Sequence, residues 1–536
     1  MTSTTKTVGG AFLTQSPDTI FVPEDFKGDD ALMIRMAEQF SRKEVLTVQE
    51  ALDAQEEGLT PRLVRQAGEL GFCGIDAPAE YGGLGLSKNL AARMLEFLSL
   101  NASFSVTIGI TSGISQVGLV YFGNDAQRAK YLPKLTSGEQ IGAYALSEPN
   151  SGSDALSMTT RADLQGDKFV LNGTKMWISN AKWADQFLVM AKVGGEKVTA
   201  FLVERDFPGV SIAREEHKMG LKGSSTARLV LENAEIPVEN MIYEEGKGHH
   251  VAFNSLNLGR FKLSSMSMGP AREAIKVSSQ YAQDRRQFGQ PLSNFGLIQS
   301  KLAHMAAWFY IAESVTYRTG ALIDGAFADS AGNIAGNMAA AAEFAIECSA
   351  SKILATELES LIVDEALQIY GGYGFTEEFP VARIYRDARI SRIYEGTNEI
   401  NRIFLADRLA RKYAAGLPGL EGDAPVARMA HAAFAQALQD IPGDSWGKAM
   451  PQVRLGALSE LAMYAYAEQS VLARAKQTCA AASLTAVAQN WLMGKAVSSY
   501  WTATGQGTDA FALTPHAVDV AEVSSLVLGG KLPLTH

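Results

Sequence analysis

The spacing of hydrophobic and polar positions changes twice along the chain. From about Asp29 to Gly138 apolar residues recur at helical intervals, whereas between Gly142 and Gly246 short alternating runs are separated by turn residues. Helical spacing returns after His250, where one apolar face contains Ile298, Leu302, Met305 and Phe309. The pattern therefore predicts helices, then a small all-β domain, then helices again.

The middle region carries the clearest strand signals. Residues 169–177 alternate around Asn172-Gly173, a dipeptide typical of two-residue hairpin turns, and we expect a hairpin there. The runs 198–203 and 227–231 predict further strands of the same domain.

A second change occurs near the C-terminal part. Gly416–Gly422 is rich in Gly and Pro and predicts a linker. Asp423, just before Ala424-Pro425, predicts a helix start, and an apolar stripe continues from Val426. The expected α+β multidomain organisation is a helical domain at 26–140, a β-barrel-like domain at 141–247, a helical bundle at 248–413, a linker at 414–425 and an additional helical region at 426–536.

Composition narrows the class of protein. A chain of 536 residues is long enough for about three or four domains, and 47% hydrophobic with 20% charged residues fits a soluble globular protein. A net charge of -10 without a basic patch argues against a nucleic-acid partner. Cys73, Cys348 and Cys479 lie far apart, which excludes a disulfide scaffold or thiolate zinc site; we expect no metal site and a reducing compartment.

Two segments bear on location. The N-terminus lacks the apolar core of a secretory signal, so we expect a cytoplasmic or mitochondrial-matrix-like protein. The uncharged run Phe97–Asn124 is long enough to span a membrane, but its Asn, Ser, Gln and Gly residues make it too polar. We interpret it as a buried helix pair.

The segment from Gln368 to Glu399 carries the strongest chemical signal. It contains Gln-Ile-Tyr-Gly-Gly-Tyr-Gly-Phe at 368–375 and Ile-Tyr-Glu-Gly-Thr-Asn-Glu at 393–399. Burial by Ile393 and Tyr394 would raise the pKa of Glu395, and the N-terminus of the following helix would favour its charged form. A carboxylate under such opposing influences suits proton abstraction. By itself the pattern leaves open that Glu395 merely caps that helix.

This segment resembles the C-terminal signature of the acyl-CoA dehydrogenase family, in which the Glu of a Tyr/Phe-Glu-Gly-Thr motif is the catalytic base. The resemblance covers roughly Phe26 to Ala410 and includes the order of a helical domain, a β domain and a four-helix bundle. The region after Asp423 is similar to the additional C-terminal domain of the very-long-chain subgroup. The resemblance implies that Glu395 is the base.

The resemblance also implies non-covalently bound FAD. Physical reasoning alone leaves alternatives: the loop 144–154 could be a surface turn, Trp177 could pack in a core, and the Arg285-Arg286 doublet could be a solvated face. In the family, the arginine matched by Arg285 reaches FAD of a neighbouring subunit, which implies a homodimer or homotetramer. The implied cofactor contacts are Tyr144, Leu146, Ser147, Gly152, Ser153, Trp177, Ile178, Ser179, Arg285, Gln287, Phe288, Gln368, Gly371, Gly372, Thr397 and Glu399.

The acyl-CoA substrate is assigned in the same way. The resemblance places Ser153, Asn257, Arg260 and Gly396 against it, with a structural ion pair as the alternative for Arg260. Some family members place the base on the helix that contains Asn257, but the corresponding position here is Gly259. Gly109 and Gly113 would leave a deeper acyl slot for a long chain, or they allow close helix packing.

Three hypotheses about function follow. The first is FAD-dependent α,β-dehydrogenation of long-chain fatty acyl-CoA to trans-2-enoyl-CoA in fatty-acid β-oxidation, with an electron-transfer flavoprotein as acceptor. The second is an acyl-CoA oxidase of the same fold that uses oxygen. The third is a catalytically weak scaffold or assembly protein, in which the helices after Asp423 contact a membrane surface or a protein partner.

Overall fold

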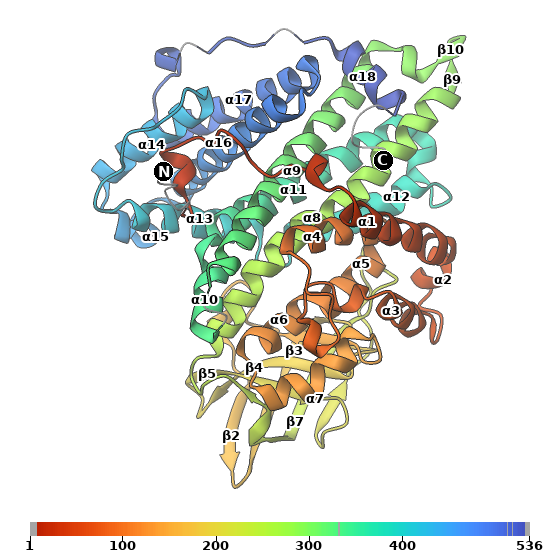
Figure 1. Ribbon diagram of the computed structural model, residues 1–536, viewed down its shortest axis with the longest axis vertical. Helices are drawn as coiled ribbons and strands as arrows, with labels where there is room; N and C mark the ends of the chain where they lie inside the picture. The colour runs from red at the N-terminus through yellow and green to blue at the C-terminus, as the bar shows by residue number, and fades with distance from the viewer. Residues whose placement is uncertain (1–7, 331–332, 512, 517, 531–536) are drawn as a thin grey trace. The chain divides into compact units, whose positions relative to one another are not determined.

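The computed structural model describes residues 8–330, 333–511, 513–516 and 518–530, which form two compact units (Figure 1). The sheet unit comprises Asp29–Lys262 and Ala326–Ala342. The bundle unit is drawn from Met1–Gly28, Leu263–Gly325 and Glu343–His536. The long helix α8, Gly248–Asp284, belongs in part to each unit.

Helices of the sheet unit confirm the helical pattern of the first part of the chain. The run Ala102–Phe122 is the one stretch, among the described residues, that is long and apolar enough to cross a membrane, and 89% of it is buried. It is a core helix interrupted by a π-helical turn at Ile110–Ile114, where Gly113 leaves helical geometry (φ -123, ψ -109). The helices are α1 Asp29–Phe40, α2 Gln49–Asp53, α3 Leu59–Glu69, α4 Lys88–Leu98, α5 Ala102–Gly109, α6 Ser115–Phe122, α7 Asp125–Thr136 and most of α10, Ile334–Glu343.

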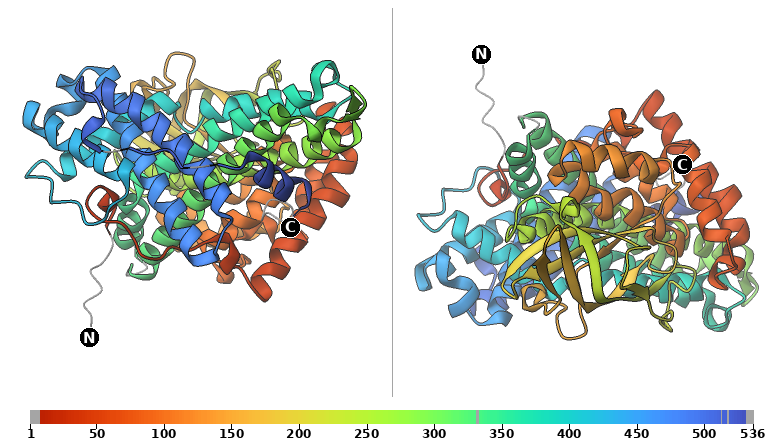
Figure 2. Two further views of the ribbon diagram at one scale, coloured as in Figure 1. Left: turned by 90° about the horizontal axis from the view of Figure 1, so that it is seen from above. Right: turned by 90° about the horizontal axis from the view of Figure 1, so that it is seen from below.

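One sheet follows these helices, and its strands are visible in the right-hand view of Figure 2. The strand order is β6-β7-β3-β2-β4-β5-β8, with β1 paired to β4 in parallel. Its interior is apolar, with Phe169, Phe187 and Phe201 at most 4% exposed. The strands are β1 Gly142–Ala145, β2 Arg161–Gln165, β3 Lys168–Ser179, β4 Gln186–Val193, β5 Lys197–Glu204, β6 Val210–Ile212, β7 Thr226–Pro237 and β8 Met241–Ile242.

The predicted hairpin turn at Asn172-Gly173 is wrong. β3 continues through both residues and pairs with β7 on either side, with a register shift between Leu171 and Gly173. A Cβ on Gly173 would lie 2.4 Å from Thr160 Oγ1, so this glycine permits a close approach inside the sheet. The tight turn is at Gly166-Asp167 instead, where β2 and β3 meet.

The bundle unit contains the predicted C-terminal helical domain and the extra helices. Both belong to one apolar core, in which Leu302, Phe309, Leu405, Phe434 and Leu458 are fully buried. The extra helices therefore complete the bundle's core. The unit contains the rest of α8, almost all of α9 Gly296–Ala328, then α11 Ala345–Tyr370, α12 Pro380–Ala388, α13 Asn398–Lys412, α14 Pro425–Asp440, α15 Trp446–Ala449, α16 Gln452–Thr478, α17 Ala482–Thr504 and α18 Val520–Leu528.

Helix α14 begins where the sequence predicts, but its cap is different. Asp423 is almost fully exposed and pairs with Arg428, and the N-cap residue Ala424 makes no side-chain bond. Glu468 of α16 instead accepts bonds from the backbone N–H groups of Val426 and Ala427 at 3.0 and 3.1 Å. Burial raises the pKa of Glu468 to about 7, against the opposing effect of these two bonds.

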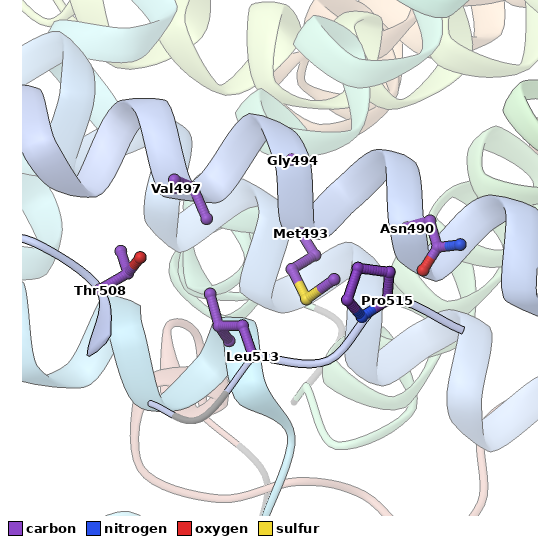
Figure 3. Close-up of a pocket in the computed structure, with 7 residues that line it drawn as sticks. All are labelled: Asn490, Met493, Gly494, Val497, Thr508, Leu513 and Pro515. Carbon is purple, nitrogen blue, oxygen red and sulfur yellow. The ribbon is translucent and has the colours of Figure 1, made fainter. Parts of the chain in front are cut away.

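A cavity of about 380 Å³ lies beside α17 (Figure 3). It is mostly apolar, and none of the predicted site residues lines it. Its lining residues are Asn490, Met493, Gly494, Val497, Thr508, Leu513 and Pro515.

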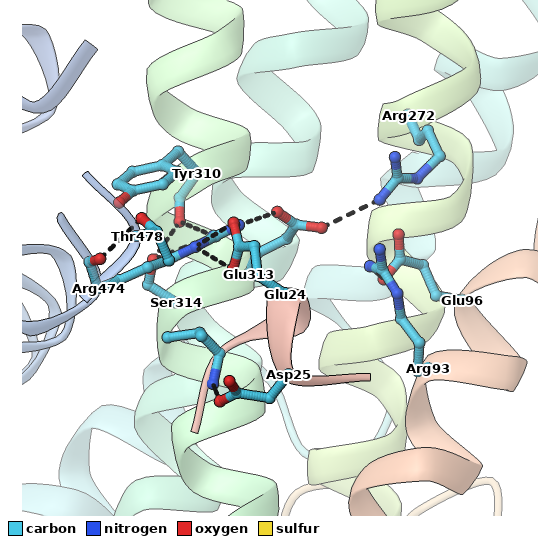
Figure 4. A network of polar contacts seen from close by, with 11 residues as sticks. Glu24, Asp25, Arg93, Glu96, Arg272, Tyr310, Glu313, Ser314, Arg474 and Thr478 are labelled. Atoms are coloured by element: carbon cyan, nitrogen blue, oxygen red, sulfur yellow. Dashed lines mark hydrogen bonds and ion pairs between the residues drawn. The ribbon is translucent and has the colours of Figure 1, made fainter. Parts of the chain in front are cut away.

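A buried charge network ties α16 to the rest of the bundle unit (Figure 4). The guanidinium of Arg474, which has no exposed surface, donates to Glu313 of α9 at 3.0 Å and to Glu24 near the N-terminus at 2.7 Å. Arg272 of α8 donates to the second oxygen of Glu313 at 3.0 Å. Two cations and two carboxylates balance in charge, so the network links four segments without leaving one of these charges unpaired.

Candidate active site

The loop before α13 presents the candidate base in an unusual backbone conformation. Glu395 has φ 57 and Gly396 has φ 80, and both residues are half-buried. A left-handed conformation is costly for a residue with a side chain and persists where surrounding contacts hold it. The side chain of Glu395 is therefore held in place by its loop.

Asn401 and Lys352 hold this loop through its carbonyl groups. The amide of Asn401 donates to the carbonyl oxygens of Glu395, Gly396 and Thr397 at 3.4, 2.8 and 3.1 Å. The ammonium of Lys352, from α11, donates to the carbonyl of Gly396 at 3.0 Å. Both donors are fully buried, so the loop geometry is set from inside the bundle.

The helix cap is a different residue from the base. Thr397 is the N-cap of α13, and its hydroxyl accepts a bond from the N–H of Ile400 at 3.3 Å. The capping alternative for Glu395 is thus excluded. Glu399 lies exposed in the first turn of the same helix.

Two ionisable groups near the loop are buried. Glu359, 3% exposed, has its pKa raised to about 8 by burial. Burial also raises the pKa of Tyr394, and the nearby Glu359 and Glu395 act in the same direction. Burial therefore favours the uncharged forms of Glu359 and Tyr394.

In the sheet unit, the predicted flavin loop is joined to β3 by a buried ion pair. Lys175 Nζ lies 2.8 Å from Glu148 Oε1, and both side chains are at most 4% exposed. Glu148 also accepts bonds from the N–H groups of Thr159 and Thr160 at 2.6 and 3.0 Å. Burial alone would raise the pKa of Glu148, but Lys175 and these bonds outweigh it and lower the pKa to about 2.

Backbone contacts complete this junction. Lys175 Nζ donates to the carbonyl of Leu146 at 3.1 Å, and the N–H of Met176 donates to the carbonyl of Ser147 at 2.8 Å. The structure therefore places the start of the predicted flavin loop, with Tyr144, Leu146 and Ser147, next to the end of β3, the other predicted flavin-contacting element. Gly152 and Ser153 lie at the exposed end of the loop, and a Cβ on Gly152 would have nothing within 4 Å.

The strand end presents Trp177 outward. Trp177 has φ 62 and is 57% exposed, whereas Ile178 is 2% exposed and Ser179 is half-buried. The β3–β7 register shifts between Lys175 and Ile178, which turns the indole away from the sheet core. Core packing is thus excluded as the role of Trp177.

On α8, Asn257 and Arg260 are both buried within the sheet unit. Asn257 Oδ1 accepts a bond from Arg260 at 3.2 Å, and its amide donates to the carbonyl of Ala341 at 3.4 Å. The role of Arg260 in binding CoA stays a prediction, and so does the alternative of a structural ion pair.

Four of the remaining cofactor candidates line a cavity of about 480 Å³ in the bundle unit. Arg285, Gln287, Gly371 and Gly372 line it, and the guanidinium of Arg285 lies 5.3 Å from the ring centre of Tyr373. A Cβ on Gly371 or Gly372 would have nothing within 4 Å, so backbone atoms are accessible there. Gln368 lies exposed near the end of α11.

Phe288 stands at the tip of a small hairpin next to this cavity. Strands β9 Arg286–Gln287 and β10 Gln290–Pro291 pair across Phe288 and Gly289, which both have positive φ as a type I′ turn requires. Phe288 is 93% exposed.

Several site residues have no signal in a local motif. The structure shows the contacts of four such residues with the loop of Glu395 or with the predicted flavin loop: Asn401, Lys352, Glu148 and Lys175. In the sequence, positions 175 and 352 are marked only by a charged residue within an apolar run. Among the described residues, no group of three His, Cys, Asp or Glu side chains could hold a metal ion.

Comparisons with known proteins agree with this geometry. Domain descriptions of acyl-CoA dehydrogenases match in succession: the N-terminal domain at residues 28–139, the middle domain at 143–234 and the C-terminal domain at 246–410. A probable acyl-CoA dehydrogenase of Bacillus subtilis (strain 168) is 45% identical over 426 residues, which is 78% of this chain and 71% of that protein.

Other relatives have the same function in their names. The mitochondrial very long-chain specific acyl-CoA dehydrogenase of Homo sapiens is 41% identical over 350 residues, 63% of this chain and 51% of that protein, so the match spans about half its length. A crystal structure of an acyl-CoA dehydrogenase complexed with FAD from Bacillus anthracis superimposes with a TM-score of 0.89 at 36% identity, covering 98% of this chain and 99% of that chain. Butyryl-CoA dehydrogenase from Megasphaera elsdenii gives a TM-score of 0.66 at 31% identity, covering 72% and 99%.

The chain belongs to the acyl-CoA dehydrogenase family. The predicted family, the multidomain α+β fold and the oxidoreductase class are confirmed. Members of the family use non-covalently bound FAD, so the expected cofactor is confirmed at the level of the family. The extra helices after Pro425 are also present, as the very-long-chain resemblance implies.

Proposed function

We propose that this protein oxidises long-chain fatty acyl-CoA thioesters to trans-2-enoyl-CoA in fatty-acid β-oxidation and passes the electrons to an electron-transfer flavoprotein. The observation that carries the proposal is Glu395 on a left-handed loop that two buried donors, Asn401 and Lys352, hold by its carbonyls. Such a loop suits a base that must meet a weakly acidic carbon at a defined position.

Glu395 removes the proton from the α-carbon of the thioester. The thioester oxygen then gains negative charge and needs hydrogen-bond donors, for which the backbone N–H of Glu395 is the candidate from the family resemblance. FAD supplies the acceptor for the hydrogen that leaves the β-carbon. Burial favours the uncharged forms of the neighbouring Glu359 and Tyr394, and Glu395 is the carboxylate that the motif assigns as the base.

The residues of the chain fit FAD in two places. In the sheet unit, the exposed Trp177 can cover a flat ring, while Ser147, Ser153 and Ser179 offer hydroxyls and Gly152 leaves the loop backbone open. In the bundle unit, the open backbone at Gly371 and Gly372 and the guanidinium of Arg285 suit a pyrophosphate and its nucleoside.

Relatives support the finer parts of the proposal. The human very long-chain enzyme supports a long acyl chain, and a structure titled as an electron transferring flavoprotein of Acidaminococcus fermentans, 33% identical with a TM-score of 0.67, supports the electron acceptor. The exposed Phe288, Leu297 and Phe375 support a homodimer or homotetramer with the FAD site at a subunit interface. Cytoplasmic or matrix-like localisation and membrane contact through the last helices stay predictions.

Anaerobic reduction of the bound flavin by saturated acyl-CoA tests the function. Glu395→Gln should keep the yellow flavin but slow its bleaching by about 10²- to 10⁴-fold, the usual contribution of a general base. Glu378→Gln is the matched control, because Glu378 is exposed in the loop before α12. Equal bleaching rates in the two variants would contradict the choice of base. Rapid reoxidation of the reduced flavin by oxygen would favour the oxidase instead.

A further inference from the structure

The loop of the candidate base is connected to α11 by hydrogen bonds within the bundle unit. Lys352 Nζ, which donates to the carbonyl of Gly396, also donates to Asn398 Oδ1 at 2.6 Å. The amide of Asn398, the first residue of α13, donates to Glu357 Oε1 at 3.0 Å and to the hydroxyl of Thr356 at 3.1 Å. The loop is thus attached to α11 through the residue that begins the next helix.

Arg402 extends this series of bonds to the additional helices. Its Nη2 donates to Glu357 Oε2 at 2.8 Å, and its Nε donates to Glu460 Oε1 of α16 at 3.2 Å. Glu460 Oε2 accepts a bond from the hydroxyl of Ser499 of α17 at 2.8 Å. Each carboxylate therefore joins two donors, and the series runs without a break from Gly396 to α17.

Charge and geometry make Arg402 the central member of the series. Its side chain is 15% exposed, and those of Glu357 and Glu460 are each 31% exposed. Burial by itself would lower the pKa of Arg402, but the two carboxylates outweigh burial and raise it. A guanidinium presents a planar fork of donors, so it binds two carboxylates in a fixed relation to each other. The fork therefore fixes α16 relative to α11 at this point.

The first turn of α13 is held at two points by one carboxylate. Asn398 and Arg402 are four residues apart and lie on one face of the helix, and both donate to Glu357. The turn directly follows the loop of Glu395, with Thr397 as its N-cap. A rotation or shift of this turn therefore moves the backbone of the loop.

Apolar packing between α13 and α16 defines this turn less narrowly. Leu405 and Leu409 of α13 and Leu458 and Leu461 of α16 are fully buried in one core. Contacts of this kind are non-directional, whereas a hydrogen bond requires a defined donor direction. The bonds of Arg402 therefore restrict the rotation of α13 about its axis more than the leucines do.

We propose that Arg402 is a positioning residue of the reaction: through its bond to Glu460, the additional helices hold the first turn of α13 so that Glu395 meets the α-carbon of the substrate. The inference rests on the proposed function and deepens it. The approach of a base to a carbon affects the rate of the chemical step more than the affinity for substrate. Loosening the series therefore slows the step and leaves binding unchanged.

Anaerobic stopped-flow reduction of the bound FAD by saturated acyl-CoA separates these two quantities. Glu460→Ala removes the partner of Arg402 on α16 and keeps its bond to Glu357. The limiting rate of flavin reduction should decrease by about 10- to 100-fold, the loss expected from a small misplacement of a reacting group. The dissociation constant of acyl-CoA, taken from the concentration dependence of the rate, should stay within about twofold of the native value.

Rescue and stability distinguish positioning from a merely structural role. Glu460→Gln keeps an amide oxygen that can accept the bond from Arg402, so its limiting rate should return to within about threefold of the native rate. Ion pairs with this much exposure contribute little to stability, so the Tm of Glu460→Ala should fall by no more than about 4 °C.

Asp440→Ala is the matched control within the additional helices. Asp440 of α14 forms a partly exposed ion pair with Arg454 of α16 that is not a member of the series, so the limiting rate should stay native. If Glu460→Ala does not fold, Arg402→Lys tests the same point, because an ammonium keeps the charge but lacks the fork that binds both carboxylates. Its limiting rate should decrease in the same way, with an unchanged dissociation constant.

The outcomes separate this inference from the proposed function. Native limiting rates in Glu460→Ala or Arg402→Lys would overturn the role of Arg402 while the proposed function stands. An equal loss of rate in Asp440→Ala, or a loss that Glu460→Gln does not restore, would also overturn it, because the effect would then be a general loosening of the additional helices. If no acyl-CoA reduces the flavin of the native protein, the proposed function fails and this inference fails with it.

Discussion

Replacing Glu148 by Gln removes one charge from the junction between the flavin loop and β3. The single amide oxygen of a glutamine can take the place of Oε1, where it accepts from Thr160 and Lys175, but the amide nitrogen then replaces Oε2 and the bond from the N–H of Thr159 is lost. Lys175, with no exposed surface, no longer has a carboxylate beside it and keeps neutral oxygen partners, among them the carbonyl of Leu146. The substitution thus leaves a buried ammonium without its counter-charge.

The cost follows from this geometry. Removing one partner of a buried ion pair costs about 3–5 kcal/mol. For a unit of this size, each kcal/mol lowers Tm by about 2–4 °C, so we expect a decrease of roughly 6–20 °C at pH 7. Because the predicted flavin loop loses its ion pair with β3, the variant should also lose FAD more readily on dilution or gel filtration.

The pH dependence has a defined sign. Burial, partly offset by Glu148, lowers the pKa of Lys175 from 10.5 to about 8 in the folded protein. A lysine whose folded pKa is lower than its unfolded pKa costs stability below the folded value, and this cost disappears as the pH rises toward 10.5. The difference in Tm between Glu148→Gln and the native protein should therefore shrink between pH 7 and pH 10.

Differential scanning calorimetry with a second substitution completes the test. Lys175→Met in the Glu148→Gln background removes the isolated charge and should recover most of the lost stability, which gives a coupling energy of about 2 kcal/mol or more. A decrease in Tm of less than about 2 °C for Glu148→Gln, with no recovery in the double variant, would show that the pair does not stabilise the flavin loop.

The remaining predictions concern the catalytic loop and the extra helices. Asn401→Ala and Asn401→Asp, which both remove the donor to three loop carbonyls, should slow flavin reduction about 10²-fold while FAD stays bound; stopped-flow rates equal to the native enzyme would contradict this. Glu468→Gln should be stabilising above pH 7. The pKa of Glu468 in the folded protein, about 7, lies above the ordinary value of 4.5. Burial of this carboxyl group therefore does not reduce the free energy of unfolding below pH 4.5 and reduces it by about 3 kcal/mol above pH 7. Thermal melts at pH 4.5 and pH 8 should show a Tm gain at the higher pH only.

Part of the candidate site could be predicted because its signals are local. Glu395, Gly396 and Thr397 form a motif in consecutive residues, and Trp177 with Ser179 forms another. Local patterns also predict the helices of both units, since apolar spacing follows the period of a helix wherever one face is buried. These predictions required no knowledge of which segments meet in space.

The Asn172-Gly173 error shows where such reasoning ends. The dipeptide has a strong turn preference. The structure nevertheless has a continuous strand there, because residues on both sides of the dipeptide pair with β7 and Thr160 packs closely against Gly173. Strand pairing overrides this local preference because the hydrogen bonds and side-chain contacts along the whole strand pair contribute more stability than the conformational preference of a single turn. Likewise, Gly113 looks like an open pocket floor in the sequence, and only its neighbour from α8 shows that the space is filled.

The sequence by itself determined the succession of helices and strands and the class of enzyme, and it predicts Glu395 as the base, because each depends on residues that are neighbours along the chain. Only the tertiary structure decided which charges are buried and with whom: Asn401 and Lys352 under the loop of Glu395, Glu148 with Lys175, and Lys262 with Asp76. The energy of a charge depends on its burial and on its partner, and for these residues both come from segments that folding brings together.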